Sequence, residues 1–350
     1  MKTIEIAGRK IGTVNPCFVI AEAGVNHNGD MQMARRLIDA ARDAGADAVK
    51  FQTFKTEKLV TVDAPRAEYQ IKNTGTQDDS QFAMLKRLEL DVDSHQELIA
   101  YCRERGILFL SSAFDEESAD LLVKLDTPAF KVGSGELTNL PFLAHMATYG
   151  KPMIVSTGMA NLGEVEIALD AITDAGNPDV ILLHCLSSYP ADPVEVNLRA
   201  MHTMQTAFDV PVGYSDHTMG NAVSLAAVAM GACIIEKHLT LDRSLPGPDH
   251  SASSEPEEFK KLVDDIRTIE SAFGDGRKKP APGELDTARV ARKSLVAARD
   301  IATGEILTEN MIAIKRPGNG LPPMLRPYLI GRMAKQAIPA GTLLTLEMLA

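Results

Sequence analysis

The 350-residue sequence lacks an uninterrupted apolar run long enough to cross a membrane. It also lacks an excess of basic residues, because 36 Lys and Arg stand against 47 Asp and Glu and give a formal net charge of −11. Nonspecific binding to nucleic acid or to an anionic membrane needs a basic surface, so this charge argues against both functions. A local positive pocket for a small anion is still compatible with it.

Closely spaced cysteine pairs are missing as well. The absence of CxxC spacing argues against a redox or zinc motif, and most of the cysteines lie in apolar segments, which predicts buried free thiols and a reducing, cytoplasmic location. The four are Cys17, Cys102, Cys185 and Cys233. The first ten residues carry charges within their apolar stretch, which argues against a signal peptide.

Short apolar runs alternate with longer amphipathic stretches from residue 18 to residue 273. The apolar runs cover residues 18–22, 48–51, 107–111, 129–132, 153–156, 180–184, 210–214 and 233–236. Their near-continuous apolarity indicates parallel strands that are covered on both faces. Helical patterns separate them at residues 31–44, 93–105, 115–125, 161–175, 193–208, 219–230 and 256–273. Eight strands in this alternation predict an α/β fold, a (β/α)₈ TIM barrel over residues 1–273.

Three other segments have a different composition. Residues 58–87 are rich in Lys, Asp, Gln and Asn and are long for a connection, which predicts a functional loop over the barrel mouth. Residues 274–291 begin with a Gly/Pro/Lys-rich stretch that is typical of a linker. Residues 292–350 contain short β-like runs and Ala/Gly turns, which predict a small second domain of about 60 residues, near the lower size limit for independent folding.

Polar side chains stand at the ends of the predicted strands. Catalytic residues of such barrels come from the C-terminal ends of the strands. The residues at that position are Glu22, Lys50, Ser111 with Ser112, Lys131 with Ser134 and Glu136, Ser156, Ser187 with Tyr189, His217 and His238. Each alone could be a cap or a surface group, but their recurrence at the same phase predicts a site at the barrel mouth.

Four of these residues suit a phosphate group. Lys50 and Lys131 would supply charge, and Ser134 and Ser156, next to glycines, would supply hydroxyl and backbone donors. The alternative for Lys131 is a solvated lysine at the end of a strand.

The two histidines suit an open metal site. His217 and His238 follow consecutive strands and are flanked by Ser215, Asp216 and Glu236. Two neutral imidazoles without a protein carboxylate would bind weakly, which favours an exchangeable Mn²⁺ or Mg²⁺ over a structural Zn²⁺. The alternative is two unrelated polar residues on loops.

The carboxylates have several candidate roles. Glu22, Glu136 and Glu236 could transfer protons or hold a polyhydroxylated substrate, and Glu236 could also orient the metal site. Asp249 could be a substrate ligand or could belong to a helix-capping turn, and the sequence favours neither.

The motifs at these positions resemble those of the sialic acid synthase family over essentially the whole chain. They are Ile20-Ala-Glu-Ala-Gly-Val-Asn-His-Asn-Gly29, Val49-Lys-Phe-Gln-Thr-Phe54, Phe130-Lys-Val-Gly-Ser-Gly-Glu136, Ser156-Thr-Gly-Met159, Tyr214-Ser-Asp-His-Thr218, Glu236-Lys-His-Leu-Thr-Leu-Asp242, Gly247-Pro-Asp-His250 and Lys315-Arg-Pro-Gly-Asn-Gly320. The resemblance implies a TIM barrel fused to a small C-terminal antifreeze-like (SAF, β-clip type) domain, which is swapped onto the partner's barrel in a homodimer. It also implies condensation of phosphoenolpyruvate with the open-chain aldehyde of an N-acylmannosamine, with release of phosphate.

The resemblance also implies roles for individual residues. Those around phosphoenolpyruvate would be Lys50, Lys131, Ser134, Ser156, Ser187 and Ser215. Those around the amino sugar would be Glu22, Asn73, Tyr189 and Asp249, with Arg316 reaching the N-acyl group from the partner. His217 and His238 would bind Mn²⁺, with Mg²⁺ or Co²⁺ as alternatives, and Glu136 and Glu236 would lie near the reacting centre. Some members have Asn at the position of Ser187, and this departure weakens that assignment and points to a different sugar.

The expected function is therefore an N-acetylneuraminate synthase acting on N-acetylmannosamine. One alternative is a legionaminate synthase acting on 2,4-diacetamido-2,4,6-trideoxymannose. A second alternative is a Schiff-base pyruvate aldolase with Lys131 or Lys50 as the amine nucleophile. A non-enzymatic carbohydrate- or ice-binding role for the small domain would leave the polar barrel mouth unexplained.

Overall fold

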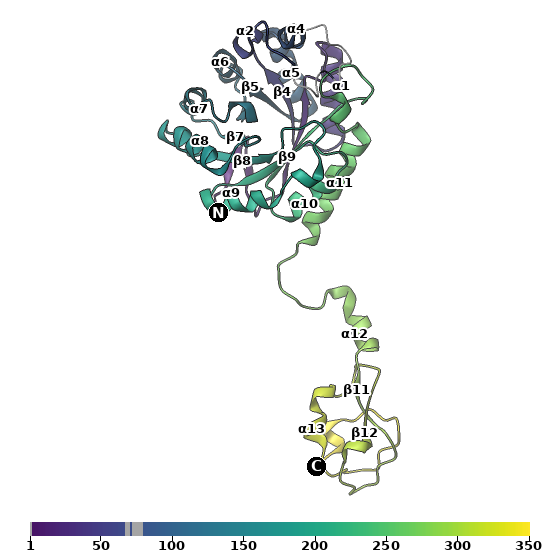
Figure 1. Cartoon of the computed structure of the whole chain (residues 1–350). Coiled ribbons are helices and arrows are strands. Elements are labelled where there is room, and N and C mark those ends of the chain that lie inside the picture. The colour runs from purple at the N-terminus through teal and green to yellow at the C-terminus, as the bar shows by residue number, and fades with distance from the viewer. Residues whose placement is uncertain (1, 67–70, 72–79) are drawn as a thin grey trace. The chain divides into compact units, whose positions relative to one another are not determined.

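The computed structural model describes residues 2–66, 71 and 80–350. The chain divides into two compact units, Met1–Phe273 and Gly274–Ala350 (Figure 1). Among the described helices, none is both long enough and apolar enough to span a membrane.

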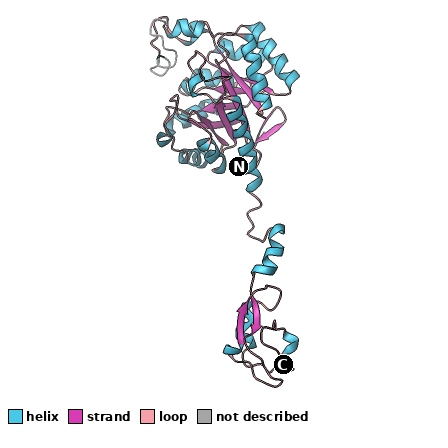
Figure 2. Ribbon diagram, turned by 90° about the vertical axis from the view of Figure 1, so that its right-hand side faces the viewer, coloured by secondary structure: helices cyan, strands magenta, loops and turns pink. Residues whose placement is uncertain are grey.

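The first unit is a closed parallel barrel surrounded by helices (Figure 2). The described strands succeed one another round the barrel in the order β10-β3-β4-β5-β6-β7-β8-β9. Their bounds are β3 Phe18–Gly24, β4 Ala48–Thr53, β5 Leu108–Ala113, β6 Phe130–Val132, β7 Met153–Ser156, β8 Val180–Cys185, β9 Val212–Asp216 and β10 Ile234–His238. The TIM barrel predicted from the eight apolar runs is confirmed.

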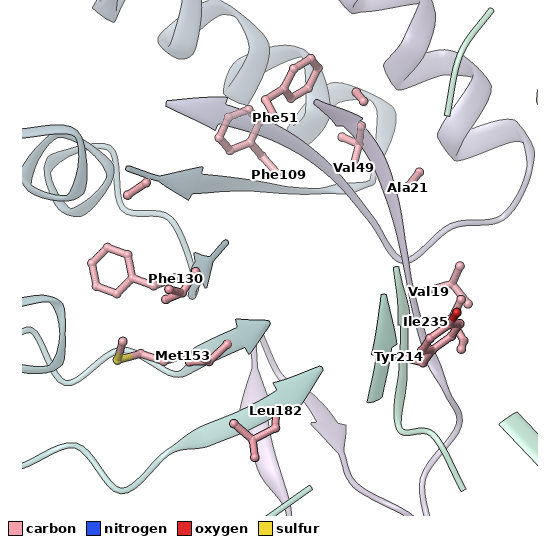
Figure 3. Close-up of a cluster of buried hydrophobic side chains, with 14 of the residues drawn as sticks. Val19, Ala21, Val49, Phe51, Phe109, Phe130, Met153, Leu182, Tyr214 and Ile235 are labelled. Carbon is pink, nitrogen blue, oxygen red and sulfur yellow. The ribbon is translucent and has the colours of Figure 1, made fainter. Parts of the chain in front are cut away.

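The barrel residues alternate between two apolar layers. Side chains such as Val19 and Tyr214 point outward and pack under the helices (Figure 3). Phe18 and Ile20 point inward and fill the interior near the N-terminal ends of the strands. Because both faces of each strand are covered, the strands are apolar almost throughout, as parallel barrel strands must be.

The helices that cover the barrel begin at local sequence signals. Asp30, Asp91 and Asp115 accept hydrogen bonds from backbone N–H groups in the first turns of α1, α5 and α6. Asn161 and Glu164 form a capping box at the start of α8. The main helices are α1 Met31–Asp43, α5 Val92–Arg105, α6 Glu116–Lys124, α7 Leu140–Ala147, α8 Leu162–Asp174, α9 Arg199–Phe208, α10 Ala222–Ala229 and α11 Pro256–Ala272.

Two of these helices differ from the sequence prediction. The helix expected at residues 193–208 is interrupted: a 3₁₀ turn covers Pro193–Glu195 and α9 starts only at Arg199, after Asn197 with a positive φ of 51°. Helix α7 was not predicted, because it is short, strongly apolar and without a side-chain cap. Its four buried residues, Phe142, Leu143, Met146 and Ala147, have the spacing of one helix face.

An N-terminal hairpin that the sequence did not reveal packs against the lower end of the barrel. Strands β1 Ile4–Ile6 and β2 Arg9–Ile11 pair antiparallel. Ile4, Ile6 and Ile11 are buried in one cluster with inward-facing residues near the starts of the barrel strands. The hairpin therefore completes the apolar packing at the N-terminal end of the barrel.

The second unit has its own small core. Strands β11 Ser294–Ala297 and β12 Ile312–Lys315 pair antiparallel, and Leu295, Leu307 and Leu344 are among its buried residues. The segment predicted as a linker contains helix α12 Leu285–Ala291, and none of residues 274–291 is buried. The composition of the segment did not reveal this short helix.

Candidate active site

A cavity of about 570 Å³ opens at the C-terminal ends of the barrel strands. Strands from around the whole barrel contribute to its lining. The predicted site residues that line it are Glu22, Lys50, Lys131, Ser134, Glu136, Ser156, Ser187, Tyr189, Ser215, His217, Glu236, His238 and Asp249. The barrel thus brings together residues that are as much as 227 positions apart in the chain, from Glu22 to Asp249.

Two predicted residues are not in this group. Asn73 lies outside the described residues. Arg316 lies in the second unit, exposed, directly after strand β12.

The strand pleat decides which polar residues face the cavity. Ser112 points inward, where its hydroxyl accepts a hydrogen bond from Lys50 Nζ at 2.8 Å. Its neighbour Ser111 points outward and pairs with Thr53 Oγ1 at 2.7 Å. Asp216, which flanks His217 in the sequence, also points outward and does not line the cavity. The period of two along a strand explains all three orientations.

Two lysines and two glutamates form a buried charged cluster at the floor of the cavity. Lys50 Nζ lies 2.7 Å from Glu22 Oε2 and 3.7 Å from Glu236 Oε1. Lys131 Nζ lies 3.5 Å from the same Glu236 oxygen. All four side chains are almost completely buried. Glu236 is therefore the carboxylate shared by both lysines.

The two glutamates respond to burial differently. Desolvation raises the pKa of Glu22 to about 7, because burial and the like charge of Glu236 outweigh its 2.7 Å contact with Lys50. Burial also acts to raise the pKa of Glu236, but Lys131 and Lys50 together hold that pKa below its usual value. Burial lowers the pKa of Lys131. Near neutral pH, Glu236 is the fixed charge and Glu22 is poised to exchange a proton.

Hydroxyl groups surround the Lys131 side of the cluster. Lys131 Nζ donates to Ser156 Oγ at 2.8 Å, and Gly158 N donates to Ser134 Oγ at 3.0 Å. A β-carbon at Gly158 would lie 2.3 Å from Ser187 Oγ and 2.7 Å from Ser134 Oγ, so only glycine lets both hydroxyls approach here. Lysines and convergent hydroxyls suit the oxygens of a phosphate or carboxylate group.

The two histidines face each other across the adjacent part of the cavity. Their ring centroids are 5.3 Å apart, and the Tyr189 ring lies 4.1 Å from that of His217. His217 Nδ1 lies 2.7 Å from the carbonyl oxygen of Leu186, to which it can donate, so that Nε2 keeps its lone pair. His238 Nδ1 is buried and has no hydrogen-bond partner among the described residues; it lies 3.9 Å from Asp249 Oδ2.

The pKa values of the two histidines shift in opposite directions. Burial acts to lower the pKa of His217, but its contacts with Cys185 and with the carbonyl group of Leu186 raise it. Burial holds the pKa of His238 well below its usual value, so the imidazole is neutral and one of its two ring nitrogens has an available lone pair. Burial raises the pKa of Asp249 to about 6. Among the described residues, no group of three His, Cys, Asp or Glu side chains is arranged to hold a metal ion. A cation here would therefore take two protein nitrogens and complete its shell with water and substrate oxygens.

The opposite wall of the cavity is largely apolar, which the sequence did not reveal. The segment expected to be a polar loop, residues 58–87, begins within helix α2 Thr56–Leu59 and contains helix α4 Gln81–Lys86. The apolar residues lining this wall are Val25, Leu59, Val60, Met84, Leu85, Leu88 and Phe114. The sequence signal for an apolar helix face at this wall was the i, i+4 spacing of Met84 and Leu88. The polar composition of the surrounding segment obscured this signal.

Comparisons with known proteins agree with this architecture. The model of the NeuB family matches residues 37–278, and that of the SAF domain matches residues 292–350. The chain is 51% identical to an N,N'-diacetyllegionaminic acid synthase of Campylobacter jejuni, over 91% of this chain and 95% of that protein. It is 46% identical to an N,N'-diacetyllegionaminic acid synthase of Legionella pneumophila, over 97% and 98% of the two chains. A crystal structure of an N-acetylneuraminic acid synthetase from Leptospira borgpetersenii aligns with a TM-score of 0.71 at 35% identity, covering 82% of this chain and 95% of that one.

Proposed function

Because the chain belongs to the NeuB family and is a phosphoenolpyruvate-dependent synthase of the sialic acid synthase type, we propose that its acceptor is 2,4-diacetamido-2,4,6-trideoxymannose. The product would be N,N'-diacetyllegionaminic acid. Two relatives that align over more than 90% of the chain bear this name, at 51% and 46% identity. N-acetylmannosamine, the acceptor expected from the sequence, is the second candidate.

The apolar wall is the observation that favours the trideoxy sugar. This sugar carries a methyl group at C6 and an acetamido group at C4, where N-acetylmannosamine carries a hydroxymethyl and a hydroxyl group. A wall of Leu59, Met84, Leu85 and Leu88 can bury methyl groups, and among its described residues Gln81 is the side chain able to bond a hydroxyl. The polar half of the cavity would hold the groups that both sugars share.

The lysine and serine residues would hold phosphoenolpyruvate. Lys50 and Lys131 would pair with its phosphate and carboxylate oxygens, and the hydroxyls would orient those oxygens. The hydroxyl donors in this role are Ser134, Ser156, Ser187 and Ser215. The anion would then replace part of the charge that Glu236 supplies to both lysines.

Residues in the part of the cavity near the histidines would hold the sugar. Glu22, Tyr189 and Asp249 line the part of the cavity nearest the histidines and would bind the acceptor, together with Asn73. In the homodimer that the family resemblance implies, Arg316 of the partner subunit would reach the N-acyl group. His217 and His238 would bind a divalent cation, Mn²⁺ with Mg²⁺ or Co²⁺ as alternatives, which when bound would supply Lewis-acid polarisation of the sugar aldehyde.

The reaction adds C3 of phosphoenolpyruvate to C1 of the open-chain sugar. The electron pair of the enol double bond forms the new C–C bond, and the aldehyde oxygen takes up a proton. Water adds to C2 and loses a proton, and the resulting tetrahedral intermediate releases phosphate by C–O cleavage. Glu22, with a pKa of about 7, suits the first proton transfer, and Glu136 or Glu236 suits the second.

Phosphate release measured with each sugar in parallel tests this function. We expect a kcat/KM higher by about tenfold or more for the trideoxy sugar, the discrimination that one methyl group in an apolar pocket supports. Met84→Gln should reduce this preference and leave the KM for phosphoenolpyruvate unchanged. Met201→Gln, on helix α9 and buried away from the cavity, is the matched control. Equal or faster turnover of N-acetylmannosamine would refute the assignment.

A further inference from the structure

Asp216 and Lys237, the residues that directly precede the two histidines, form a buried ion pair. Lys237 Nζ lies 2.8 Å from Asp216 Oδ2, and the two residues are 2% and 1% exposed. They are register partners on the parallel strands β9 and β10. Both side chains point away from the cavity, so the pair lies on the outer face of the two strands, behind the histidines.

The surroundings of the pair fix it in one geometry. Asp216 Oδ1 accepts hydrogen bonds from the backbone and hydroxyl of Thr218, both at 2.8 Å, and from the hydroxyl of Tyr214 at 3.2 Å. Its Oδ2 accepts from Ser224 Oγ at 2.5 Å as well as from Lys237. Lys237 also donates to the carbonyl oxygen of Thr218 at 2.7 Å. The carboxylate and the ammonium group are thus held by several directional bonds.

Stability alone does not require charges at these two positions. Outward-facing residues at the ends of other barrel strands, such as Ala113, Val132 and Val155, are apolar and pack under the helices. A buried ion pair pays a desolvation penalty, and well-packed apolar residues in its place are often as stable or more stable. Directional bonds do what apolar contacts cannot, because they set the distance and angle between the two strand ends.

We infer that the Asp216–Lys237 pair positions His217 and His238 for a divalent cation. Each histidine is one peptide bond from a member of the pair, and strand alternation turns it to the inner face. The backbone carbonyl groups of the two histidines are held as well. Ala191 N donates to the carbonyl oxygen of His217 and Ser254 N to that of His238, both at 2.8 Å. The separation of the imidazoles therefore depends on the pair behind them. This inference rests on the proposed metal role of the histidines.

Binding of Mn²⁺ alone to the chelator-treated full-length chain tests this role. Free Mn²⁺ is quantified by its electron paramagnetic resonance signal as the ion is titrated in. Asp216→Asn should weaken Mn²⁺ binding about 10- to 100-fold, the usual effect of losing a residue that orients metal ligands. Ser224→Ala keeps both charges and removes one hydrogen bond to the carboxylate, so it should fold and weaken binding about fivefold.

Asp47→Asn is the matched control. Asp47 is buried and paired with Arg267 at 3.0 Å, but it directly precedes strand β4, at the opposite end of the barrel from the cavity. We expect a lower melting temperature for this variant with Mn²⁺ affinity within about twofold of the native chain.

The binding experiment has clear negative outcomes. Native Mn²⁺ affinity in both Asp216→Asn and Ser224→Ala would overturn the inference, and so would an equal loss in Asp47→Asn. If Asp216→Asn does not fold, the Mn²⁺ affinity of Ser224→Ala alone tests the inference. A native chain that makes the sugar acid but binds no Mn²⁺ would also overturn the inference and leave the proposed reaction standing. Mn²⁺ binding without product from either sugar would instead refute the proposed function.

Discussion

Replacing Glu236 with Gln removes the one carboxylate that both cavity lysines share. In the native chain, Lys131 Nζ and Lys50 Nζ lie 3.5 and 3.7 Å from Glu236 Oε1. In Glu236→Gln the two ammonium groups stay buried, and among the described residues Glu22 is the carboxylate left within 4 Å of either of them. The variant should therefore be less stable than the native chain when no anionic substrate is present.

The size of the loss can be bounded in two ways. At an effective dielectric constant of about 20, one unit charge pair at about 3.5 Å interacts by about 5 kcal/mol before desolvation is counted. Removal of one partner from a buried pair typically costs about 3–5 kcal/mol. A second bound comes from Lys131, which can lose its proton instead: deprotonating a lysine of ordinary pKa, about 10.4, costs about 5 kcal/mol at pH 7. We expect a loss of about 3–5 kcal/mol.

Deprotonation of Lys131 also makes the loss depend on pH. When deprotonation relieves the unbalanced charge, the folded variant binds fewer protons than the unfolded one, so its stability rises with pH. At about pH 9 the cost of a neutral Lys131 falls to about 2 kcal/mol. The difference between variant and native should therefore shrink between about pH 7 and about pH 9.

Thermal unfolding with and without phosphoenolpyruvate is the assay. Phosphoenolpyruvate should recover much of the lost melting temperature, because its negative charges take the place of the missing carboxylate. Glu136→Gln is the control, since Glu136 lines the same cavity but is only half-buried and accepts a hydrogen bond from Asn139; its stability should change by about 0.5 kcal/mol or less. A Glu236→Gln variant as stable as the native chain near neutral pH would refute the charge-balance argument.

Four further outcomes are expected. Glu136→Gln should still bind phosphoenolpyruvate and lose turnover, and unchanged turnover would reject its role as proton carrier. The raised pKa of Glu22 makes its ionisation destabilising, so the contribution of Glu22 to stability should be greatest below about pH 4.5 and be lost as pH rises through about 7; the difference in stability between the native chain and Glu22→Gln, measured by unfolding across this range, should show this loss. Chelators should abolish phosphate release, and Mn²⁺ with phosphoenolpyruvate should together raise the melting temperature, a rise that His217→Ala should reduce to the effect of phosphoenolpyruvate alone. Borohydride with pyruvate should leave Lys131 unmodified, and a trapped adduct would favour the Schiff-base aldolase instead.

Local features of the sequence were enough to predict the barrel. Apolar runs mark each strand, and the aspartates that cap α1, α5 and α6 lie within or beside the predicted helices. Such signals act over a few residues and can be seen without knowledge of the fold. Helix α7 and the β1–β2 hairpin were missed because both depend on packing against distant parts of the barrel.

Most residues of the candidate site were predicted from the rule that catalytic residues lie at the C-terminal ends of the barrel strands. It depends only on counting strands and identifying the residues just after each of them, because a closed barrel places all its C-terminal strand ends at one mouth. It could not tell Ser112 from Ser111, or show that Asp216 points away from the cavity beside His217. Which of two adjacent residues faces the cavity depends on the strand register, and only the neighbouring paired strands define that register.

The kind of fold, the residues able to carry the chemistry and the family thus follow from the amino-acid sequence, because they depend on residue type, order and local spacing. How those residues act on one another depends on the folded barrel. The pKa of Glu22 near 7, the carboxylate of Glu236 shared by two lysines and the apolar wall around Met84 all arise where segments distant in sequence meet. Desolvation and charge pairing depend on distance in space, and distance in space is a property of the folded barrel.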